Sequence, residues 1–329
     1  MSRILTGIQS TGTPHLGNIL GAILPAIRLA QNPANESFLF IADMHSLTQI
    51  KDGATLRNNT YATAATWLAF GLNPEQTVFY RQSDVPEVTE LTWYLLCQYP
   101  YQRLTLAHSF KDKADRLDDV NGGLFTYPIL MAADILLYDA DEVPVGEDQR
   151  QHIEITRDIA MRFNGRFGDT FVVPKIVTPR AGAKVTDLQE PTAKMSKSSN
   201  TDAGIVYLLD EPAAILKKFK RAVTDSDGEV RFDRAEKPGV SNLIEILAAC
   251  TSRTPQQVAG EYTQYGPLKA DAGEAVVEIL APIQHRYHEL MGDKAELSRL
   301  LRTGAEKARA VASATLERTY NNIGLLSPE

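Results

Sequence analysis

Two lysines lie three positions apart in a polar stretch of the sequence, residues 191–200 (PTAKMSKSSN). Each of them, Lys194 and Lys197, can offer a positive charge with three hydrogen-bond donors to the oxygens of a phosphate group. The stretch has almost no bulky apolar side chain, so we expect an exposed loop in which Met195 contacts an apolar surface. Taken alone, such a pattern is more typical of a solvated basic loop, and phosphate binding needs support from elsewhere in the chain.

A second polar segment, residues 7–18 (GIQSTGTPHLGN), follows a short apolar run and precedes a periodic apolar stretch. A strand, a tight turn and a helix start in this order are typical of a parallel sheet that presents a helix N-terminus to phosphate. Gly17 lets a ligand approach the backbone, and His15 and Asn18 supply side-chain donors beside it. Taken alone this pattern is weak evidence, but together with the lysine loop it gives the chain two candidate phosphate-binding segments.

A carboxylate interrupts an apolar and aromatic stripe near the middle of the chain. At helical spacing, one face carries Tyr127, Met131, Asp134, Ile135 and Tyr138. A buried carboxylate at Asp134 is unfavourable unless a partner is present. An arginine across the core would satisfy it, and so would the N–H group of a ligand.

Length and composition limit the possible fold classes and partners. With 329 residues, 43% of them hydrophobic, the chain can bury a large core and is long enough for two domains. The net charge of −7 argues at face value against a polyanion partner, although local basic stripes can coexist with an acidic remainder. Residues 217–221 (KKFKR) form one such stripe and residues 103–116 another. The first fits equally well as a basic helix end that complements the helix dipole.

The sequence has no apolar run long enough for a membrane span, and its first residues show no export signal. We therefore expect a cytoplasmic protein that does not enter a membrane. Its two cysteines, Cys97 and Cys250, are predicted to be buried and unpaired. His285 and His288 lie three apart in a helical pattern, but no third ligand of suitable spacing follows, so we expect surface residues and no metal site.

Short apolar runs alternate with helical patterns in the first half of the chain. Strands are predicted at residues 4–8, 37–42, 78–80, 143–145 and 171–173, and helices at 16–29, 54–70 and 146–162. This alternation predicts an α/β fold with a doubly wound parallel sheet, whose ligands lie at the carboxyl ends of the strands. Later helices are expected at 210–221, 240–250, 255–262, 268–291 and 294–321.

Residues 15–18 (HLGN) and 194–198 (KMSKS) resemble the two signature motifs of class I aminoacyl-tRNA synthetases. With residues 123–138, 143–149 and 222–226, the resemblance covers essentially the whole chain and is to bacterial tryptophanyl-tRNA synthetases. This family resemblance implies a reaction in two steps. L-tryptophan reacts with ATP to give tryptophanyl-adenylate and pyrophosphate, and tryptophan is then transferred to the 3′ end of tRNA(Trp). It also implies Mg²⁺ carried by the nucleotide phosphates.

The resemblance further implies an organisation into domains. A Rossmann-like catalytic domain would span residues 1–200, and an α-helical domain that recognises the tRNA anticodon would span residues 201–329. A segment inserted at about 86–119 would form a homodimer interface. Its apolar residues are more numerous than one helix face needs: Leu91, Trp93, Tyr94, Leu95, Leu96 and Tyr99.

Roles for individual residues follow from the same resemblance. The implied catalytic residues are Lys194, Lys197, Lys113, His15 and Asn18. The implied ATP contacts are Gln9, Ser10, Thr11, Gly17, Asn18, Gly146, Glu147, Asp148, Val185, Lys194, Met195, Ser196, Lys197 and Ser198. The implied tryptophan contacts are Asp134, as the acceptor for the indole N–H, with Tyr127, Met131, Ile135, Val143, Val145, Gln149, His45, Leu5 and Gly7.

Some of these residues also have ordinary structural explanations. Glu147 and Asp148 would otherwise be acids favoured in the first turn of a helix, and His45 a structural histidine. The chain departs from well-known members of the family at His15, where they have threonine, and at Leu5, where they have phenylalanine. They also continue the lysine loop with Asp-Pro in place of residues 199–200.

Two other functions remain compatible with the sequence. Tyrosine specificity on the same scaffold would need polar partners for a phenol, whereas the stripe around Asp134 offers one carboxylate among apolar groups. A catalytically silent RNA-binding relative would tolerate loss of His15, Lys194 or Lys197, and all three are present.

Overall fold

Five parallel strands form one sheet: β1 (Ser2–Gln9), β2 (Asn35–Ala42), β3 (Val78–Arg81), β4 (Glu142–Pro144) and β5 (Lys175–Val177). Their order is β3-β2-β1-β4-β5, which confirms the predicted α/β fold with a doubly wound parallel sheet. The computed structural model describes residues 2–10, 12–105, 121–146, 149–177, 184–196 and 201–326. Because the chain continues to opposite sides of β1, a crevice opens at the carboxyl ends of β1 and β4.

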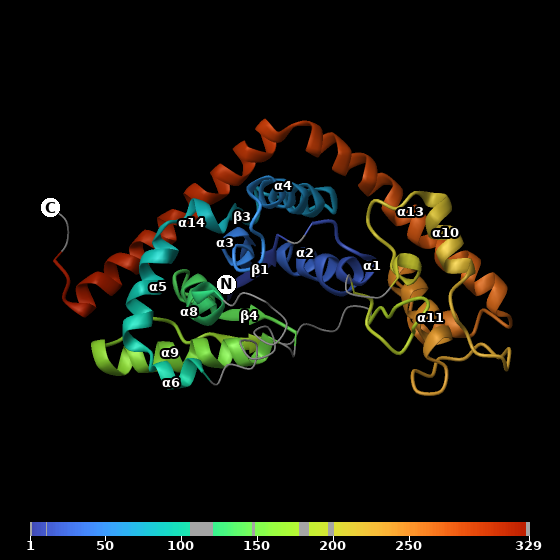
Figure 1. Cartoon of the computed structure of the whole chain (residues 1–329), viewed down its shortest axis with the longest axis horizontal. Helices are drawn as coiled ribbons and strands as arrows, with labels where there is room; N and C mark the ends of the chain where they lie inside the picture. The colour runs from blue at the N-terminus through green and yellow to red at the C-terminus, as the bar shows by residue number, and fades with distance from the viewer. Residues whose placement is uncertain are drawn as a thin grey trace.

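The two faces of the sheet pack into two separate clusters of buried side chains, as the period of two in a strand requires. Leu39, Ile41 and Phe79 face helices α2 (Leu24–Ala30) and α4 (Gly53–Ala69). Phe38, Phe40 and Tyr80 face helices α5 (Glu87–Gln98), α8 (Gly122–Leu136) and α9 (Arg150–Phe167). In Figure 1, α9 lies below the strands, and α5 and α8 lie to their left. The site described below lies on this second face.

The helix predicted at residues 16–29 is present in three parts: α1 (Leu16–Asn18), a π-helical turn η1 (Ile19–Ile23) and α2. Pro25 stands at the start of α2. It has no N–H to donate to the carbonyl four residues earlier, so the turn before it widens.

Short elements complete the sheet-containing part: α3 (Asp43–Ser46), the 3₁₀ turn η2 (Gln82–Asp84), α6 (Tyr101–Leu104) and, later in the chain, η4 (Asp202–Gly204). The helices expected after residue 201 are α10 (Pro212–Lys220), α11 (Pro238–Thr251), α12 (Pro255–Ala259), α13 (Tyr265–Gly292) and α14 (Lys294–Ile323). Within the described ranges, every helix is too short or too polar to cross a membrane.

The last helix returns to the sheet. In Figure 1, α14 leaves the end of α13 and runs back along α4, β3 and α5. A Cβ atom at Gly304 would lie 1.8 Å from the carbonyl oxygen of Phe79, so only glycine allows this close approach of helix and strand. Arg309 donates to the buried carboxylate of Glu87 at 3.0 Å and fixes the helix further along. The proposed boundary at residue 200 stays a prediction, but α14 packs on the sheet-containing part.

Two predictions about local structure are wrong. Residues 171–173 are not a strand, because the side chain of Asn164 accepts from the N–H of Phe171 and donates to its carbonyl, which uses the groups a strand would pair. Strand β5 follows four residues later. Cys97 is exposed, because it lies on the outward side of α5. Cys250 is partly buried, and burial raises the pKa of its thiol to about 12.

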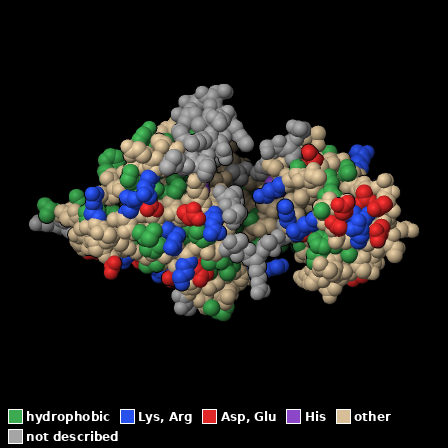
Figure 2. All heavy atoms as spheres, turned by 90° about the horizontal axis from the view of Figure 1, so that it is seen from below, with side chains coloured by type: hydrophobic (Ala, Val, Ile, Leu, Met, Phe, Trp, Pro, Cys, Tyr) green, Lys and Arg blue, Asp and Glu red, His purple; other side chains and the backbone are tan. Residues whose placement is uncertain are grey.

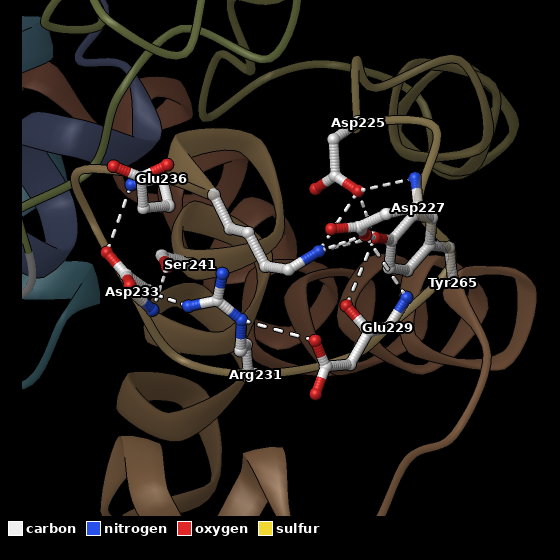
Figure 3. Close-up of polar contacts among 9 residues, drawn as sticks. Asp225, Asp227, Glu229, Arg231, Asp233, Glu236, Ser241 and Tyr265 are labelled. Carbon is white, nitrogen blue, oxygen red and sulfur yellow. Dashed lines mark hydrogen bonds and ion pairs between the residues drawn. The ribbon is translucent and has the colours of Figure 1, made fainter.

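A buried lysine organises the loop between α10 and α11. The side chain of Lys237 is 1% exposed, and its ammonium donates to Asp225 and Tyr265, each at 3.1 Å, and to Asp227 (Figure 3). Burial alone would lower the pKa of Lys237, but these partners outweigh it and the pKa is raised. The hydrogen bond from Lys237 lowers the pKa of Asp227. The ammonium therefore holds the loop against the starts of α11 and α13.

We predict that Lys237→Met lowers the melting temperature by several degrees, because it leaves two carboxylates facing each other without their cation. The pKa of Asp227 is lowered and that of Lys237 raised, so the pair is fully charged between their ordinary values of 3.8 and 10.5. The difference in melting temperature between the unchanged protein and Lys237→Met should therefore be constant from about pH 5 to pH 9. Lys217→Met, at an exposed position of α10, is the matched control. Calorimetry that gave equal melting temperatures for both variants would contradict this assignment.

Candidate active site

A cavity of about 420 Å³ opens at the carboxyl ends of β1 and β4. Its volume lies in the range of small-molecule sites, roughly 300–1,000 Å³. All ten residues predicted to contact the amino acid line it: Leu5, Gly7, His45, Tyr127, Met131, Asp134, Ile135, Val143, Val145 and Gln149. They come from β1, α3, α8, β4 and the segment before α9, which the sheet order brings together.

The carboxylate of Asp134 is the polar centre of this cavity. Asp134 is 2% exposed, and its carboxylate accepts hydrogen bonds from Nε2 of His45 at 2.9 Å and from Nε2 of Gln82 at 2.8 and 2.9 Å. These two partners, and not the arginine considered from the sequence, satisfy the buried charge. Burial raises the pKa of Asp134, while the hydrogen bonds from His45 and Gln82 act in the opposite direction.

The aromatic residues of the stripe separate into two groups. The hydroxyl of Tyr127 and Nε2 of His152 are 3.0 Å apart, and both residues line the cavity. Tyr138 lies just beyond the end of α8 and packs against Phe38 and Tyr80, with ring centroids 5.2 and 5.7 Å away. Tyr138 therefore belongs to the core, although helical spacing placed it on the same face as Asp134.

Three important residues of the site were missed by the sequence reasoning: Phe40, Gln82 and His152. Phe40 is paired in register with Gly7, and a Cβ atom at Gly7 would lie 2.8 Å from its ring. Gly7 is therefore needed because the ring of Phe40 lies against it. A glycine in one strand and an aromatic residue in the next was the available signal. His152 follows Gln149 by three positions, one helical turn later.

The turn at residues 12–18 ends in a tight cap on α1. Nδ1 of His15 accepts from the N–H of Asn18 at 3.3 Å, and Oδ1 of Asn18 accepts from the N–H of His15 at 3.2 Å. A neutral His15 ring in this arrangement carries its proton on Nε2, because Nδ1 is the acceptor. The predicted donors of these two residues are therefore Nε2 of His15 and Nδ2 of Asn18.

The lysine loop begins as a narrow hairpin. The N–H of Asp187 donates to the carbonyl of Ala193 at 3.0 Å, and Thr186 pairs with Lys194. Val185 and Met195 are buried, whereas Lys194 is exposed. A Cβ atom at Gly17 would lie 3.6 Å from Cβ of Met195, so Met195 contacts the turn, as expected of an anchor.

The turn and the chain after the lysine loop are paired directly. The N–H of Leu16 donates to the carbonyl of Val206 at 2.7 Å, and the N–H of Leu208 donates to the carbonyl of Pro14 at 2.9 Å. These backbone bonds bring the two predicted phosphate-binding segments to one place. The structure thus joins segments that are far apart in the sequence.

The remaining predicted nucleotide contacts differ in placement. Gln9 and Gly146 are exposed near the mouth of the cavity, and Ser196 is partly exposed at the end of the hairpin. Ser10 is fully buried, and its hydroxyl lies 3.1 Å from that of Thr60 in α4, so it faces away from the crevice. The predictions at Thr11, Lys113, Glu147, Asp148, Lys197 and Ser198 lie outside the described residues.

Comparisons with known proteins agree with this geometry. The model of the family "tRNA synthetases class I (W and Y)" matches residues 1–281. The chain is 48% identical to the tryptophan–tRNA ligase of Mycobacterium leprae, over 99% of this chain and 97% of that one. The tryptophanyl-tRNA synthetase structure from Mycoplasma pneumoniae matches with a TM-score of 0.88 at 35% identity, over 99% of both chains. The one from Campylobacter jejuni, complexed with ADP and tryptophan, matches with a TM-score of 0.84 at 35% identity, over 98% of this chain and 100% of that one.

The matches cover the sheet, the cavity and the helices that follow, at identities well above those at which a fold alone is shared. This chain therefore belongs to the class I tRNA synthetases for tryptophan and tyrosine, and within them to the bacterial tryptophan–tRNA ligases.

Proposed function

We propose that the cavity between β1, β4 and α8 binds L-tryptophan, which this ligase activates with ATP and transfers to tRNA. The observation that carries the proposal is a buried carboxylate beside a wall of apolar and aromatic side chains in the cavity, among them Leu5, Phe40 and Ile135. Indole has one hydrogen-bond donor and a large apolar surface, and this wall offers one matching acceptor.

Asp134 has room for one more hydrogen bond. An ionised carboxylate accepts about four, and the bonds from His45 and Gln82 account for three. The indole N–H takes the remaining position, while Leu5, Phe40 and Ile135 contact the ring. Phenylalanine has no such donor and would leave the carboxylate unpaired. A mismatch of this kind can lower kcat/KM for the analogue by about 10⁴-fold or more.

The backbone of the amino acid lies near the mouth of the cavity in this proposal. Gln149 and His45 contact its ammonium and carboxylate groups, and Gln9 lies between this region and the turn. Because Gln9 ends β1 and the turn follows it, the tryptophan carboxylate and the nucleotide are neighbours. This placement suits attack of the carboxylate on the α-phosphorus of ATP.

The reaction needs no general base, because the carboxylate of tryptophan is already ionised at neutral pH. It needs alignment and neutralisation of the charge that develops on pyrophosphate. We assign this to Lys194 with Lys197 and Lys113, assisted by Nε2 of His15 and by Asn18. Mg²⁺ would be held by the nucleotide phosphates and would supply further neutralisation. The resulting tryptophanyl-adenylate is attacked by a ribose hydroxyl at the 3′ end of tRNA(Trp).

The helical part is proposed to contact tRNA(Trp). Figure 2 shows an indentation between the sheet-containing part and the helical part, with Lys and Arg side chains on the edge of the helical part that faces it. In the basic stripe of α10, Lys218 donates to Asp210 and to a backbone carbonyl, so it supports the fold. Lys217 and Lys220 are exposed and available to phosphate. A cytoplasmic location follows from this role in translation.

We also propose a homodimer through the segment at 86–119. Leu91 and Leu95 are buried within their own chain, so they are not available for a contact with a second copy. Trp93 and Tyr101 are the candidates for such a contact, because 64% and 66% of their surfaces are exposed. Sedimentation at micromolar concentration should give a dimer for the unchanged protein and a monomer for Trp93→Asp. A monomeric unchanged protein would contradict the proposal.

Asp134→Ala should lower the preference for tryptophan over phenylalanine in ATP–pyrophosphate exchange by about 10²-fold or more, because the acceptor for the indole N–H is lost. Asp84→Ala removes a carboxylate that pairs with Arg81 outside the cavity and is the control. An unchanged preference in the Asp134 variant would show that the pocket is misplaced.

Lys194→Ala should lower the rate of tryptophan activation by about 10²–10³-fold and leave the affinity for tryptophan within about twofold, because the lysine acts on charge that develops in the transition state. Lys184→Ala, at an exposed lysine of the same hairpin, is the matched control. Pre-steady-state kinetics and equilibrium binding separate the two quantities. Equal losses in both would argue against a role in the transition state.

A further inference from the structure

We propose that Gln82, which does not line the cavity, is a positioning residue that sets the specificity of Asp134 for an N–H donor. The proposal rests on the assignment of Asp134 as acceptor for the indole N–H. It adds a residue that acts on the substrate only through another side chain.

The orientation of the Gln82 amide is fixed from both ends. Gln82 is 1% exposed and begins the 3₁₀ turn η2, directly after β3. Its Nε2 donates to both oxygens of Asp134, at 2.8 and 2.9 Å, while its Oε1 accepts from the N–H of His45 at 3.4 Å. Since the oxygen is held by a backbone donor, the nitrogen must point at the carboxylate. Gln82 thus connects His45 and Asp134, two polar residues that line the cavity.

The same turn serves a second buried acid. The N–H and hydroxyl of Ser83 donate to the carboxylate of Asp43, at 3.0 and 2.5 Å. Burial raises the pKa of both Asp43 and Asp134, and the negative charge of Asp43 raises the pKa of Asp134 further. Successive residues of η2 therefore supply donors to two different carboxylates.

Two consequences follow for the carboxylate of Asp134. The bonds from Gln82 to both oxygens and from His45 to one of them hold the carboxylate in one orientation, so that its remaining lone pair points into the cavity. They also stabilise its ionised form against burial and Asp43, while the other titratable groups that face it are His45, Tyr80 and Tyr138. Without Gln82, a larger share of Asp134 is protonated or rotated. A protonated carboxyl accepts less well and no longer requires an N–H from the ring.

The test compares tryptophan with its benzothiophene analogue, in which sulfur replaces the ring N–H. We expect Gln82→Met to lower the preference of kcat/KM for tryptophan over this analogue by about tenfold or more, through loss of one oriented acceptor in a buried site. The loss should appear as a higher KM for tryptophan, with kcat and the KM for ATP within about twofold, because the interaction is present before and during reaction.

Gln284→Met is the matched control. The amide of Gln284 donates to the carbonyls of Leu208 and Asp210, away from the cavity, so the preference should stay at the unchanged protein's value. An unchanged preference in a folded Gln82→Met variant would overturn the role of Gln82 but leave the assignment of Asp134 standing. If the unchanged protein itself showed no preference for tryptophan over the analogue, the assignment of Asp134 would fail, and this proposal with it.

Gln82→Glu keeps the shape of the side chain and tests the same point if the methionine variant does not fold. Its carboxyl can donate to Asp134 only while it holds a proton. In this variant the preference for tryptophan should be near that of the unchanged protein at about pH 6. It should fall towards about pH 9, because Asp134 and the introduced glutamate then lose the proton that they share. A preference that did not change with pH in this variant would contradict the proposal.

Discussion

One buried carboxylate governs the cavity that we propose as the tryptophan site. A carboxylate in an apolar cavity is tolerated only when donors surround it, and for Asp134 these come from α3 and η2, while the residue itself stands on α8. Three elements must therefore be held in register for one acceptor to face the ligand. The sheet does this, because η2 follows β3, α3 follows β2, and β1 with β4 forms the floor of the cavity.

The nucleotide end depends on a different kind of connection. Backbone hydrogen bonds join the turn at 14–16 to residues 206–208, and Met195 packs against Gly17. The lysine loop is thus anchored on the turn with which we propose that it binds the nucleotide. Since β1 lines the cavity and then leads into this turn, one strand connects the proposed tryptophan site to the proposed nucleotide site. Helix α14 and the loop around Lys237 stabilise the surrounding framework and lie outside the lining of the cavity.

The sequence predicted correctly those features for which a residue pattern is compatible with only one arrangement of the chain. Alternating apolar runs and helices require a parallel sheet, and the family motifs then place Asp134, Tyr127 and Val143 at its carboxyl edge. It failed where the outcome depends on a distant partner. Gln82 follows β3 and carries no motif, and only the fold brings its amide to Asp134. Residues 171–173 have strand-like composition, but Asn164 takes their hydrogen bonds. The return of α14 depends on a single glycine meeting a carbonyl of β3.

The central claim is that Asp134 receives the ring N–H of tryptophan inside the cavity. A crystal structure of the protein with L-tryptophan bound tests it most directly. We expect the indole nitrogen within about 3 Å of a carboxylate oxygen of Asp134, with the bonds from His45 and Gln82 retained. An indole nitrogen that faced solvent or another acceptor, or tryptophan bound outside this cavity, would contradict the claim.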